Sequence, residues 1–110
     1  MTDKIVVLSA CASTEEAGRI ARELVEKRVA ACVNIVSGVR SVYRWKEEIA
    51  DEPEVLLIVK TSRELFPKLR TELEKLHSYE VPEVIALPIV DGAERYLEWL
   101  DREVASGQDS

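Results

Sequence analysis

Two extended segments of unusual length occupy the middle of the chain and constrain its fold more than any other feature. The first covers residues 31–45, and the second runs from Glu48 to about Thr61, after a turn at Lys46-Glu47. Strands in globular proteins are usually about 5–6 residues long, so two arms of this length predict one long β-hairpin. Gly38 interrupts the first arm, and we interpret it as a bulge and not as the end of the strand.

The remaining apolar patterns predict the elements on either side of this hairpin. The run Ile5-Val6-Val7-Leu8 predicts a strand over residues 4–11, and Ser13-Thr14-Glu15-Glu16 is a capping box for a helix up to about Lys27. Ser62 is predicted to cap a second helix that ends near Leu76. A loop over 77–82, a strand over 84–89 with Pro88 at the sheet edge, and a short final helix follow. On that helix the inward residues are predicted to be Ala93, Tyr96, Leu97 and Leu100, and Trp99 is predicted to pack against a neighbouring subunit.

The order β-α-β-β-α-β-α predicts an α/β (α+β) fold with a ferredoxin-like split βαβ antiparallel sheet, a long β-hairpin and an extra C-terminal helix. We expect one domain over residues 1–105 and a frayed polar tail at 106–110. Both main helices would cover the same face of the sheet. The other face and the free edges of the hairpin would stay uncovered, which predicts pairing with further copies of the chain.

Composition and the missing motifs exclude several classes of function. The formal net charge is −6 and the basic residues form no stripe, so we expect no nucleic-acid partner. No apolar run approaches the roughly 20 residues of a spanning helix, and no export signal is visible, so we expect no membrane partner and a cytoplasmic location. The two cysteines are expected to be thiols. No phosphate loop, nucleophile elbow or dinucleotide fingerprint is found, so we do not expect an enzyme.

A series of short motifs extends over nearly the whole chain. In order, they are Ala30-Ala31-Cys32-Val33-Asn34-Ile35, Ser41-Val42-Tyr43-Arg44-Trp45, Lys60-Thr61, Tyr79-Glu80-Val81-Pro82-Glu83, Pro88-Ile89 and Tyr96-Leu97-Glu98-Trp99-Leu100. This ordered set resembles the CutA family of divalent-cation tolerance proteins. The resemblance implies a tight homotrimer with three sheets around a central axis, similar to the trimeric PII signalling proteins. It also implies a response to metal ions, with copper or another divalent ion as the ligand and no required cofactor.

Three positions depart from the family's usual pattern. Glu47 stands at the hairpin tip where the family usually has Gly, so we expect a different turn there. Pro53 lacks a backbone donor and predicts a bulge or an unpaired N–H in the second arm. Ser78 stands where the family usually has Pro, which loosens the loop after the second helix. None of these changes alters the predicted fold.

The resemblance implies Cys11, Cys32 and His77 as metal ligands, and thiolate and imidazole groups suit copper and zinc. One site made by all three is not expected. Cys11 ends the first strand whereas Cys32 begins a parallel strand, so they should lie at opposite ends of the sheet, roughly 17–20 Å apart. His77 ends the second helix at the same end as Cys11, which makes this the better pair. A structural role is the alternative for each residue, as a buried thiol or a helix-terminal imidazole.

A second group resembles the residues that line the inter-subunit cleft of the family: Tyr43, Trp45, Lys60, Tyr79 and Glu80. Aromatic walls with one cation and one carboxylate could hold a small ligand, or the aromatic residues could anchor the trimer. The main hypothesis is therefore a homotrimeric divalent-cation tolerance protein that binds metal ions. The alternative is a PII-like signalling or structural trimer that binds a small ligand or a partner protein at the cleft, with incidental metal effects.

Overall fold

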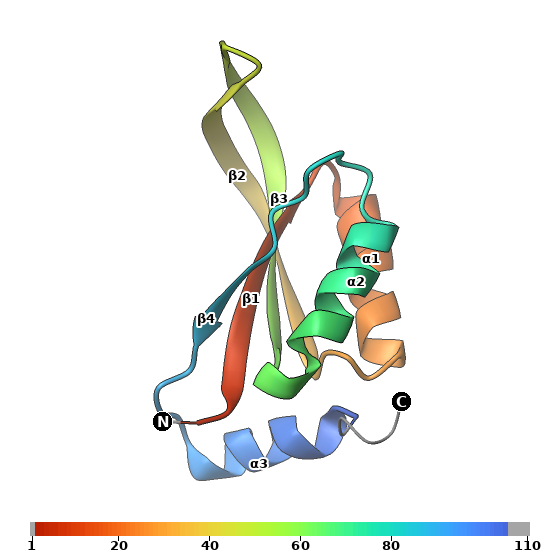
Figure 1. Cartoon of the computed structure of the whole chain (residues 1–110), viewed down its shortest axis with the longest axis vertical. Helices are drawn as coiled ribbons and strands as arrows, with labels where there is room; N and C mark the ends of the chain where they lie inside the picture. Colours follow the sequence, from red (N-terminus) through yellow and green to blue (C-terminus); the bar gives the residue numbers. More distant parts are fainter. Residues whose placement is uncertain (1, 106–110) are drawn as a thin grey trace.

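The computed structural model describes residues 2–105, and the predicted tail at 106–110 lies outside the described residues. The described residues form four strands and three α-helices (Figure 1). In order, the elements are β1 (Lys4–Cys11), α1 (Thr14–Glu26), β2 (Cys32–Trp45), β3 (Glu48–Ser62), a 3₁₀ turn (Arg63–Leu65), α2 (Phe66–Leu76), β4 (Ile85–Pro88) and α3 (Glu94–Glu103).

The sheet has the strand order β2-β3-β1-β4, and all neighbouring strands are antiparallel. Helices α1 and α2 lie together on one face of the sheet, and α3 crosses its lower end (Figure 1). This is the predicted ferredoxin-like split βαβ arrangement with an extra C-terminal helix. Pro88 ends the edge strand β4, as its missing backbone donor predicted.

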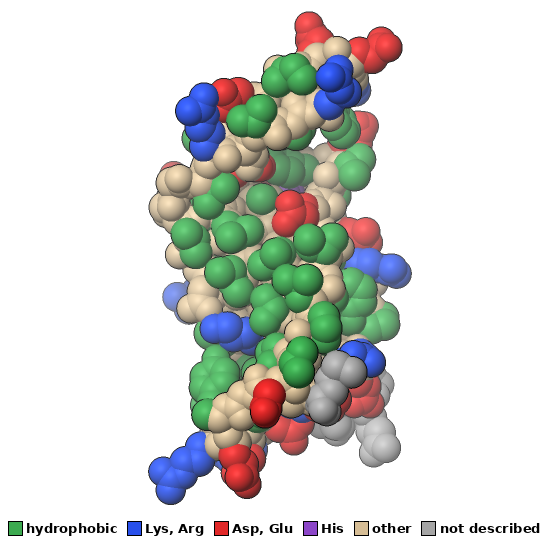
Figure 2. Space-filling view, turned by 90° about the vertical axis from the view of Figure 1, so that its left-hand side faces the viewer, with side chains coloured by type: hydrophobic (Ala, Val, Ile, Leu, Met, Phe, Trp, Pro, Cys, Tyr) green, Lys and Arg blue, Asp and Glu red, His purple; other side chains and the backbone are tan. Residues whose placement is uncertain are grey.

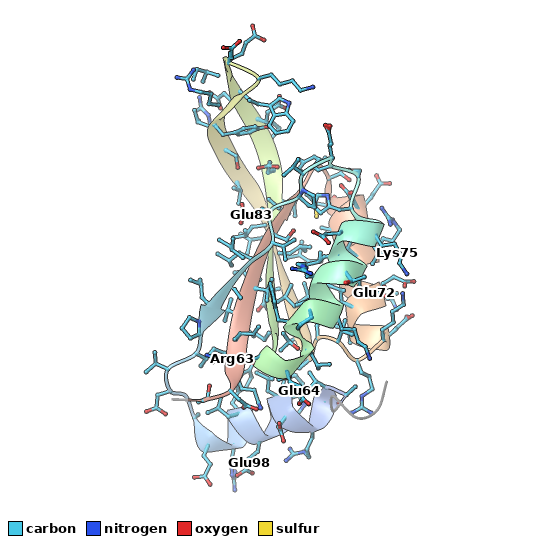
Figure 3. All side chains as sticks on the ribbon, in the orientation of Figure 1. Arg63, Glu64, Glu72, Lys75, Glu83 and Glu98 are labelled. Carbon is cyan, nitrogen blue, oxygen red and sulfur yellow. The ribbon has the colours of Figure 1, made fainter. Side chains whose placement is uncertain are left out.

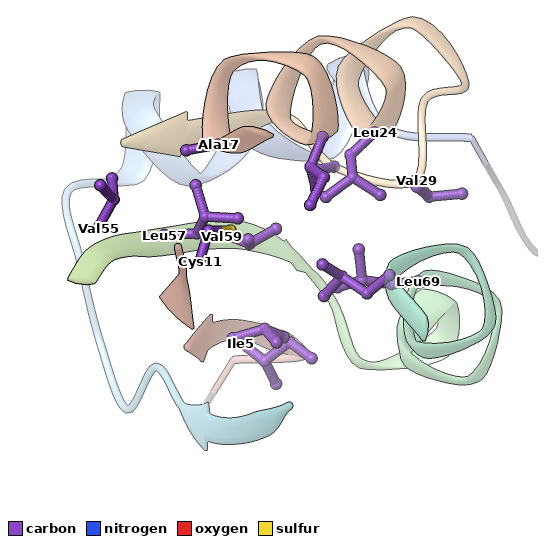
Figure 4. Close-up of a cluster of buried hydrophobic side chains, with 13 residues drawn as sticks. Ile5, Cys11, Ala17, Leu24, Val29, Val55, Leu57, Val59 and Leu69 are labelled. Carbon is purple, nitrogen blue, oxygen red and sulfur yellow. The ribbon is translucent and has the colours of Figure 1, made fainter. Parts of the chain in front are cut away.

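The main core fills the space between the sheet and α1 and α2 (Figure 4). Alternate strand residues such as Val7, Leu57 and Val59 are fully buried against Leu24 and Leu69 of the helices. Burial of each such side chain contributes about 1.5–3 kcal/mol relative to exposure. The continuous β-branched and leucine runs of β1 and β3 therefore form the two central strands of the sheet.

The two main helices begin in different ways. The Ser13 hydroxyl accepts a hydrogen bond from the Glu16 N–H at 3.1 Å, which confirms the Ser13 cap of α1. The predicted capping box is not completed, because the Glu16 carboxylate accepts from the Ala12 N–H at 3.3 Å and the Ser78 N–H at 2.8 Å. Ser62 makes no side-chain cap, and a 3₁₀ turn separates it from α2, so the predicted helix start at Ser62 is wrong. The Arg63 N–H instead donates to the Asp3 carbonyl at 2.7 Å, so a backbone contact to the start of the chain takes the place of the cap.

The hairpin of β2 and β3 extends well beyond the rest of the sheet (Figure 1). β1 pairs with β3 only from Val55 to Ser62, so residues 48–54 and the facing part of β2 form a free two-stranded ribbon. The register shifts between Val36 and Val39, and Gly38 there has a φ of 80°, which confirms the predicted bulge. Pairing stays regular at Pro53, which faces Arg40, so the bulge that was one of the two predicted outcomes does not occur there.

The hairpin tip is a two-residue turn with Lys46 at φ 49° and Glu47 at φ 68°. Two positive φ angles are the signature of a type I′ turn, which matches the twist of a hairpin and favours Asn and Gly. Glu47 thus adopts the conformation that suits glycine.

The face of the sheet away from the helices is apolar and uncovered. Its side chains come from all four strands and gather across the middle of the face in Figure 2. The strand register places on it Val6, Leu8, Val36, Leu56, Ile58, Ile85 and Leu87, which we call the open apolar face. Ile85 is 51% exposed and Leu87 is 48% exposed. An apolar surface of this extent is typical of an interface.

Helix α3 packs on the end of the sheet through a small second cluster. Leu100 and Val104 are buried there with Leu65 and Ala31, and Trp99 packs against them. Trp99 therefore contacts its own subunit, and the predicted packing against a neighbour is not needed to explain it. Tyr96, predicted to face inward, is 42% exposed, and Ala93 is also exposed. No helix among the described residues combines the length and apolar character required to cross a membrane.

Candidate functional site

A cavity of about 630 Å³ lies where the free ribbon of the hairpin meets the connection between α2 and β4. Figure 3 labels Glu83 on this connection, where it passes the sheet. We call this cavity the hairpin cleft. It is lined by Ala10, Ser41, Val42, Tyr43, Trp45, Glu54, Tyr79, Glu80, Val81 and Glu83. Four of the five residues predicted for the cleft are thus brought together within one subunit.

Glu54 and Tyr79 form the polar base of the hairpin cleft. The Tyr79 hydroxyl donates to Glu54 Oε2 at 2.7 Å, and Glu54 is only 9% exposed although it is a carboxylate. Burial raises the pKa of Tyr79, and the hydrogen bond to the Glu54 carboxylate and the charge of that group raise it further. The phenol therefore stays protonated and acts as a donor to Glu54 at neutral pH.

The lining of the hairpin cleft is acidic and aromatic. Glu54, Glu80 and Glu83 contribute carboxylates, and none of the lining residues is Lys, Arg or His. Tyr43 and Trp45 lie on the ribbon with rings that are nearly half exposed. The arrangement joins π faces to negative charge in one concave surface, which is suited to cations and apolar bodies.

Lys60, the cation predicted for this cleft, lies elsewhere in the subunit. It faces Cys32 and Val6 in the sheet, far along β3 from Ala50, which pairs with Tyr43. Its ammonium donates to Asn34 Oδ1 at 2.7 Å and lies 6.0 Å from the Tyr96 ring. Within one chain Lys60 therefore does not join the aromatic residues, and its place in an inter-subunit cleft stays a prediction.

His77 is held in a network at the end of β1. Its Nε2 donates to the Ala10 carbonyl at 2.7 Å, and its Nδ1 accepts from the Tyr79 N–H at 3.1 Å. Glu16 Oε2 accepts from the Ser78 N–H at 2.8 Å and lies 4.0 Å from His77 Nδ1. Both ring nitrogens are engaged, and the imidazole is fully buried. This geometry positions the loop that carries Tyr79.

The two cysteines lie at different ends of the sheet, as predicted. Cys11 pairs with Val55 and Cys32 with Lys60, five residues apart along β3, or about 17 Å. Cys11 is fully buried, and burial together with the charges of Glu16 and Glu54 raises its thiol pKa to about 11. A neutral buried thiol is a poor metal ligand, because the thiolate is the ligand form.

Cys32 is partly exposed, and its thiol lies 4.0 Å from Asn34 Oδ1. It belongs to the polar lower end of the same face that carries the open apolar residues. Within residues 2–105, no three or more His, Cys, Asp or Glu side chains form a group that could hold a metal ion. Cys11, Cys32 and His77 as metal ligands stay a prediction.

Sequence reasoning missed Glu54 and Glu83 as cleft residues. A signal for Glu54 was present, because it precedes Leu56 by two residues and therefore shares its side of β3. The lining residues of β2 were harder to predict, because the bulge changes which of its residues lie on the same side of the sheet as Glu54. Glu83 lies in a connection without regular structure, and periodicity carries no information about such a segment.

The model of the CutA1 divalent ion tolerance protein family matches residues 5–103. The chain is 53% identical over 95 residues to the divalent-cation tolerance protein CutA of Thermus thermophilus, covering 86% of this chain and 92% of that protein. It is 44% identical over 100 residues to human protein CutA, covering 91% of this chain and 56% of the human protein. A solved structure of the divalent cation tolerance protein of Thermus thermophilus superposes with a TM-score of 0.90 at 49% identity, covering 93% of this chain and 99% of the other.

Proposed function

Since the chain belongs to the CutA1 divalent ion tolerance family, we propose that it serves in tolerance of divalent cations as a binding protein, not an enzyme, and that it works as a homotrimer. The open apolar face is the observation that best supports the homotrimer. Seven apolar residues from four strands lie on it, and no helix or strand within residues 2–105 covers them. Their removal from water would favour association by about 25 cal/mol for each Å² of apolar surface.

The free edges of the hairpin support the same proposal. Residues 48–54 of β3 pair with β2 but not with β1, so the other edge of this segment is free among the described residues. The edge of β2 that faces away from β3 is also unpaired there. Unpaired edges of this length present rows of backbone donors and acceptors, which pair readily with another strand. Association of like chains would therefore satisfy the backbone of the hairpin and bury the open apolar face together.

Light scattering coupled to size exclusion tests the oligomer with one disruptive and one control variant. Ile58→Glu places a charge in the middle of the open apolar face, and we expect it to reduce the trimer mass to that of one chain. Val25→Glu puts the same charge at an exposed position of α1, on the opposite side, and should stay trimeric. A wild-type monomer, or equal dissociation of both variants, would contradict the proposal.

For metal ions, the exposure of the predicted donors separates the candidates. Cys11 is a buried thiol and His77 has both nitrogens engaged, whereas Cys32 is partly exposed and carries only a long contact to Asn34. Thiolate ligands select soft ions such as Cu(I), and a ligand must be accessible to the ion. This supports Cys32 as the residue that binds copper, in preference to Cys11 with His77.

Equilibrium dialysis against copper, with the bound metal measured by atomic absorption, distinguishes these donors. We expect Cys32→Ser to lower the bound copper and Cys11→Ser to leave it unchanged. Loss in Cys11→Ser alone would instead support the pair of Cys11 and His77. Equal binding in the wild type and in both variants would exclude thiol ligation and leave the metal effect incidental.

The hairpin cleft favours a second candidate function, a PII-like signalling or structural trimer that binds a small ligand or a partner protein. Its volume of about 630 Å³ is within the range of small-molecule sites, about 300–1,000 Å³. The cleft lies beside the open apolar face, because Ala10 and Leu56 are paired on adjoining strands. Ligand binding there would be placed to influence the association of subunits.

A further inference from the structure

Glu54 is a buried carboxylate without a cationic partner. Only 9% of the residue is exposed, and its only side-chain hydrogen bond among residues 2–105 is the one that Tyr79 donates to Oε2. None of the ion pairs in the described part of the chain includes Glu54. Buried charges in proteins are normally paired, because removal of a lone carboxylate from water is unfavourable by several kcal/mol.

The surroundings of Glu54 point to what would pair with it. Glu80 and Glu83 lie on the same cavity, so the local charge is negative, and the lining contains no basic side chain. The rings of Tyr43, Trp45 and Tyr79 line the walls. Carboxylates combined with aromatic faces are the surroundings in which proteins bind ammonium and guanidinium groups.

Trp45 already attracts a cation from its own chain. The ammonium of Lys46 lies 5.8 Å from the centre of the Trp45 ring. Lys46 belongs to the hairpin tip and does not line the cavity, so it does not neutralise Glu54. The ring is therefore positioned where cation–π attraction operates, at the mouth of a cavity with an unpaired carboxylate at its base.

We propose that the hairpin cleft binds a small organic cation, with its ammonium or guanidinium group at Glu54 and its apolar body against Tyr43, Trp45 and Tyr79. The proposal deepens the second candidate function given above and rests on it. The cleft volume of about 630 Å³ accommodates a molecule of one or two rings. All the lining residues belong to one chain. Tyr43, Trp45 and Glu54 lie on the same side of the sheet as the open apolar face, so in the proposed trimer the cation would bind beside a neighbouring copy.

Three probes of nearly equal shape test the charge preference by isothermal titration calorimetry: benzylammonium, benzyl alcohol and benzoate. We expect benzylammonium to bind at least about tenfold more tightly than benzyl alcohol, because only the cation adds charge attraction to the carboxylates and cation–π contacts to the hydrogen bond with Glu54. Benzoate should show no binding, since three carboxylates repel it. Equal affinity for the cation and the alcohol, or no binding of the cation, would overturn the proposal.

Two glutamate variants locate the contact. Glu54→Gln keeps an oxygen that can accept from Tyr79, and it should weaken benzylammonium binding about tenfold. Glu52→Gln removes the same charge two residues away, at an exposed position outside the cavity, and should leave the affinity within about twofold. Equal effects of the two variants would show general charge attraction only and would overturn the assignment to Glu54.

Light scattering on the same samples separates this proposal from that of the homotrimer. A wild-type trimer that does not bind benzylammonium would overturn the cation site and leave the trimer standing, as expected if a Lys or Arg of a neighbouring copy fills the cleft. A monomer that binds benzylammonium with loss in Glu54→Gln would support the cation site and contradict the trimer.

Discussion

Two buried hydroxyl groups in the sheet should respond in opposite ways to the same deletion. Ser9 of β1 and Thr61 of β3 are both fully buried on the side of the helices. The Thr61 hydroxyl donates to the Val29 carbonyl at 2.7 Å, whereas Ser9 Oγ has no hydrogen-bond partner within the described structure. We therefore predict that Ser9→Ala stabilises the protein and that Thr61→Val destabilises it.

The magnitudes follow from what each deletion leaves behind. Ser9→Ala removes a hydroxyl whose desolvation without a partner is unfavourable by about 1–3 kcal/mol. The lost dispersion contacts of one oxygen, at about 0.1–0.2 kcal/mol each, offset part of this gain. We expect a net stabilisation of about 1 kcal/mol. Thr61→Val keeps the shape of the side chain but leaves the buried Val29 carbonyl without this donor, so it should destabilise by about 1–3 kcal/mol.

Urea unfolding followed by far-UV circular dichroism measures both changes. All variants should be compared at one protein concentration, because the stability of an oligomer depends on concentration. The urea midpoint of Ser9→Ala should rise and that of Thr61→Val should fall, with unchanged slopes. If Ser9→Ala lowers the midpoint as Thr61→Val does, Ser9 has a hydrogen-bond partner and the reasoning is refuted.

Two further perturbations test local features. Glu47→Gly at the hairpin tip should stabilise the protein by up to about 1 kcal/mol, because glycine adopts positive φ without strain. The thermal midpoint should therefore rise, and a lower midpoint would contradict the turn geometry. Glu16 tests pH dependence: burial acts to raise its pKa, but hydrogen bonds from Ser78 and Ala12 outweigh it and hold the pKa below 4.5. The stabilisation is therefore present above pH 4.5 and lost as pH falls through the lower pKa of the folded state. Glu16→Gln should show a shallower loss of stability in acid unfolding, and an unchanged acid profile would exclude this role.

The fold could be predicted because local patterns and chain order agree. The apolar runs of β1 and β3 fix the central strands, and the Ser13 cap fixes the start of α1. The length of the two hairpin arms also predicted that the face of the sheet away from the helices would be uncovered. Ser62 shows the limit, because the hydroxyl suits a helix cap but the adjacent backbone binds to Asp3. A contact between distant segments overrides the local signal there.

The candidate site was harder to predict, because it depends on register. Tyr43, Trp45, Tyr79 and Glu80 could be grouped by resemblance, and the structure brings them together. Lys60 lies far along β3 from Ala50, the partner of Tyr43, so its place beside the aromatic residues requires a neighbouring copy and stays a prediction. The lack of a cationic partner for Glu54 could not be predicted at all. It depends on which side chains meet in the folded chain, and no basic side chain of the described residues lines the cavity.

The bulge at Gly38 determines which side chains of β2 lie on the open side of the sheet in the upper part of the hairpin. Below it, even-numbered residues of β2 such as Val36 share the open side of the sheet, and above it the odd-numbered residues Tyr43 and Trp45 do so. Deletion of one residue here would move the side chains of the upper part of β2 to the opposite side and present Val42 and Arg44 in place of the aromatic rings. A length change of one residue, with no change of side-chain chemistry, would thus convert an acidic aromatic cleft into a surface with a basic group.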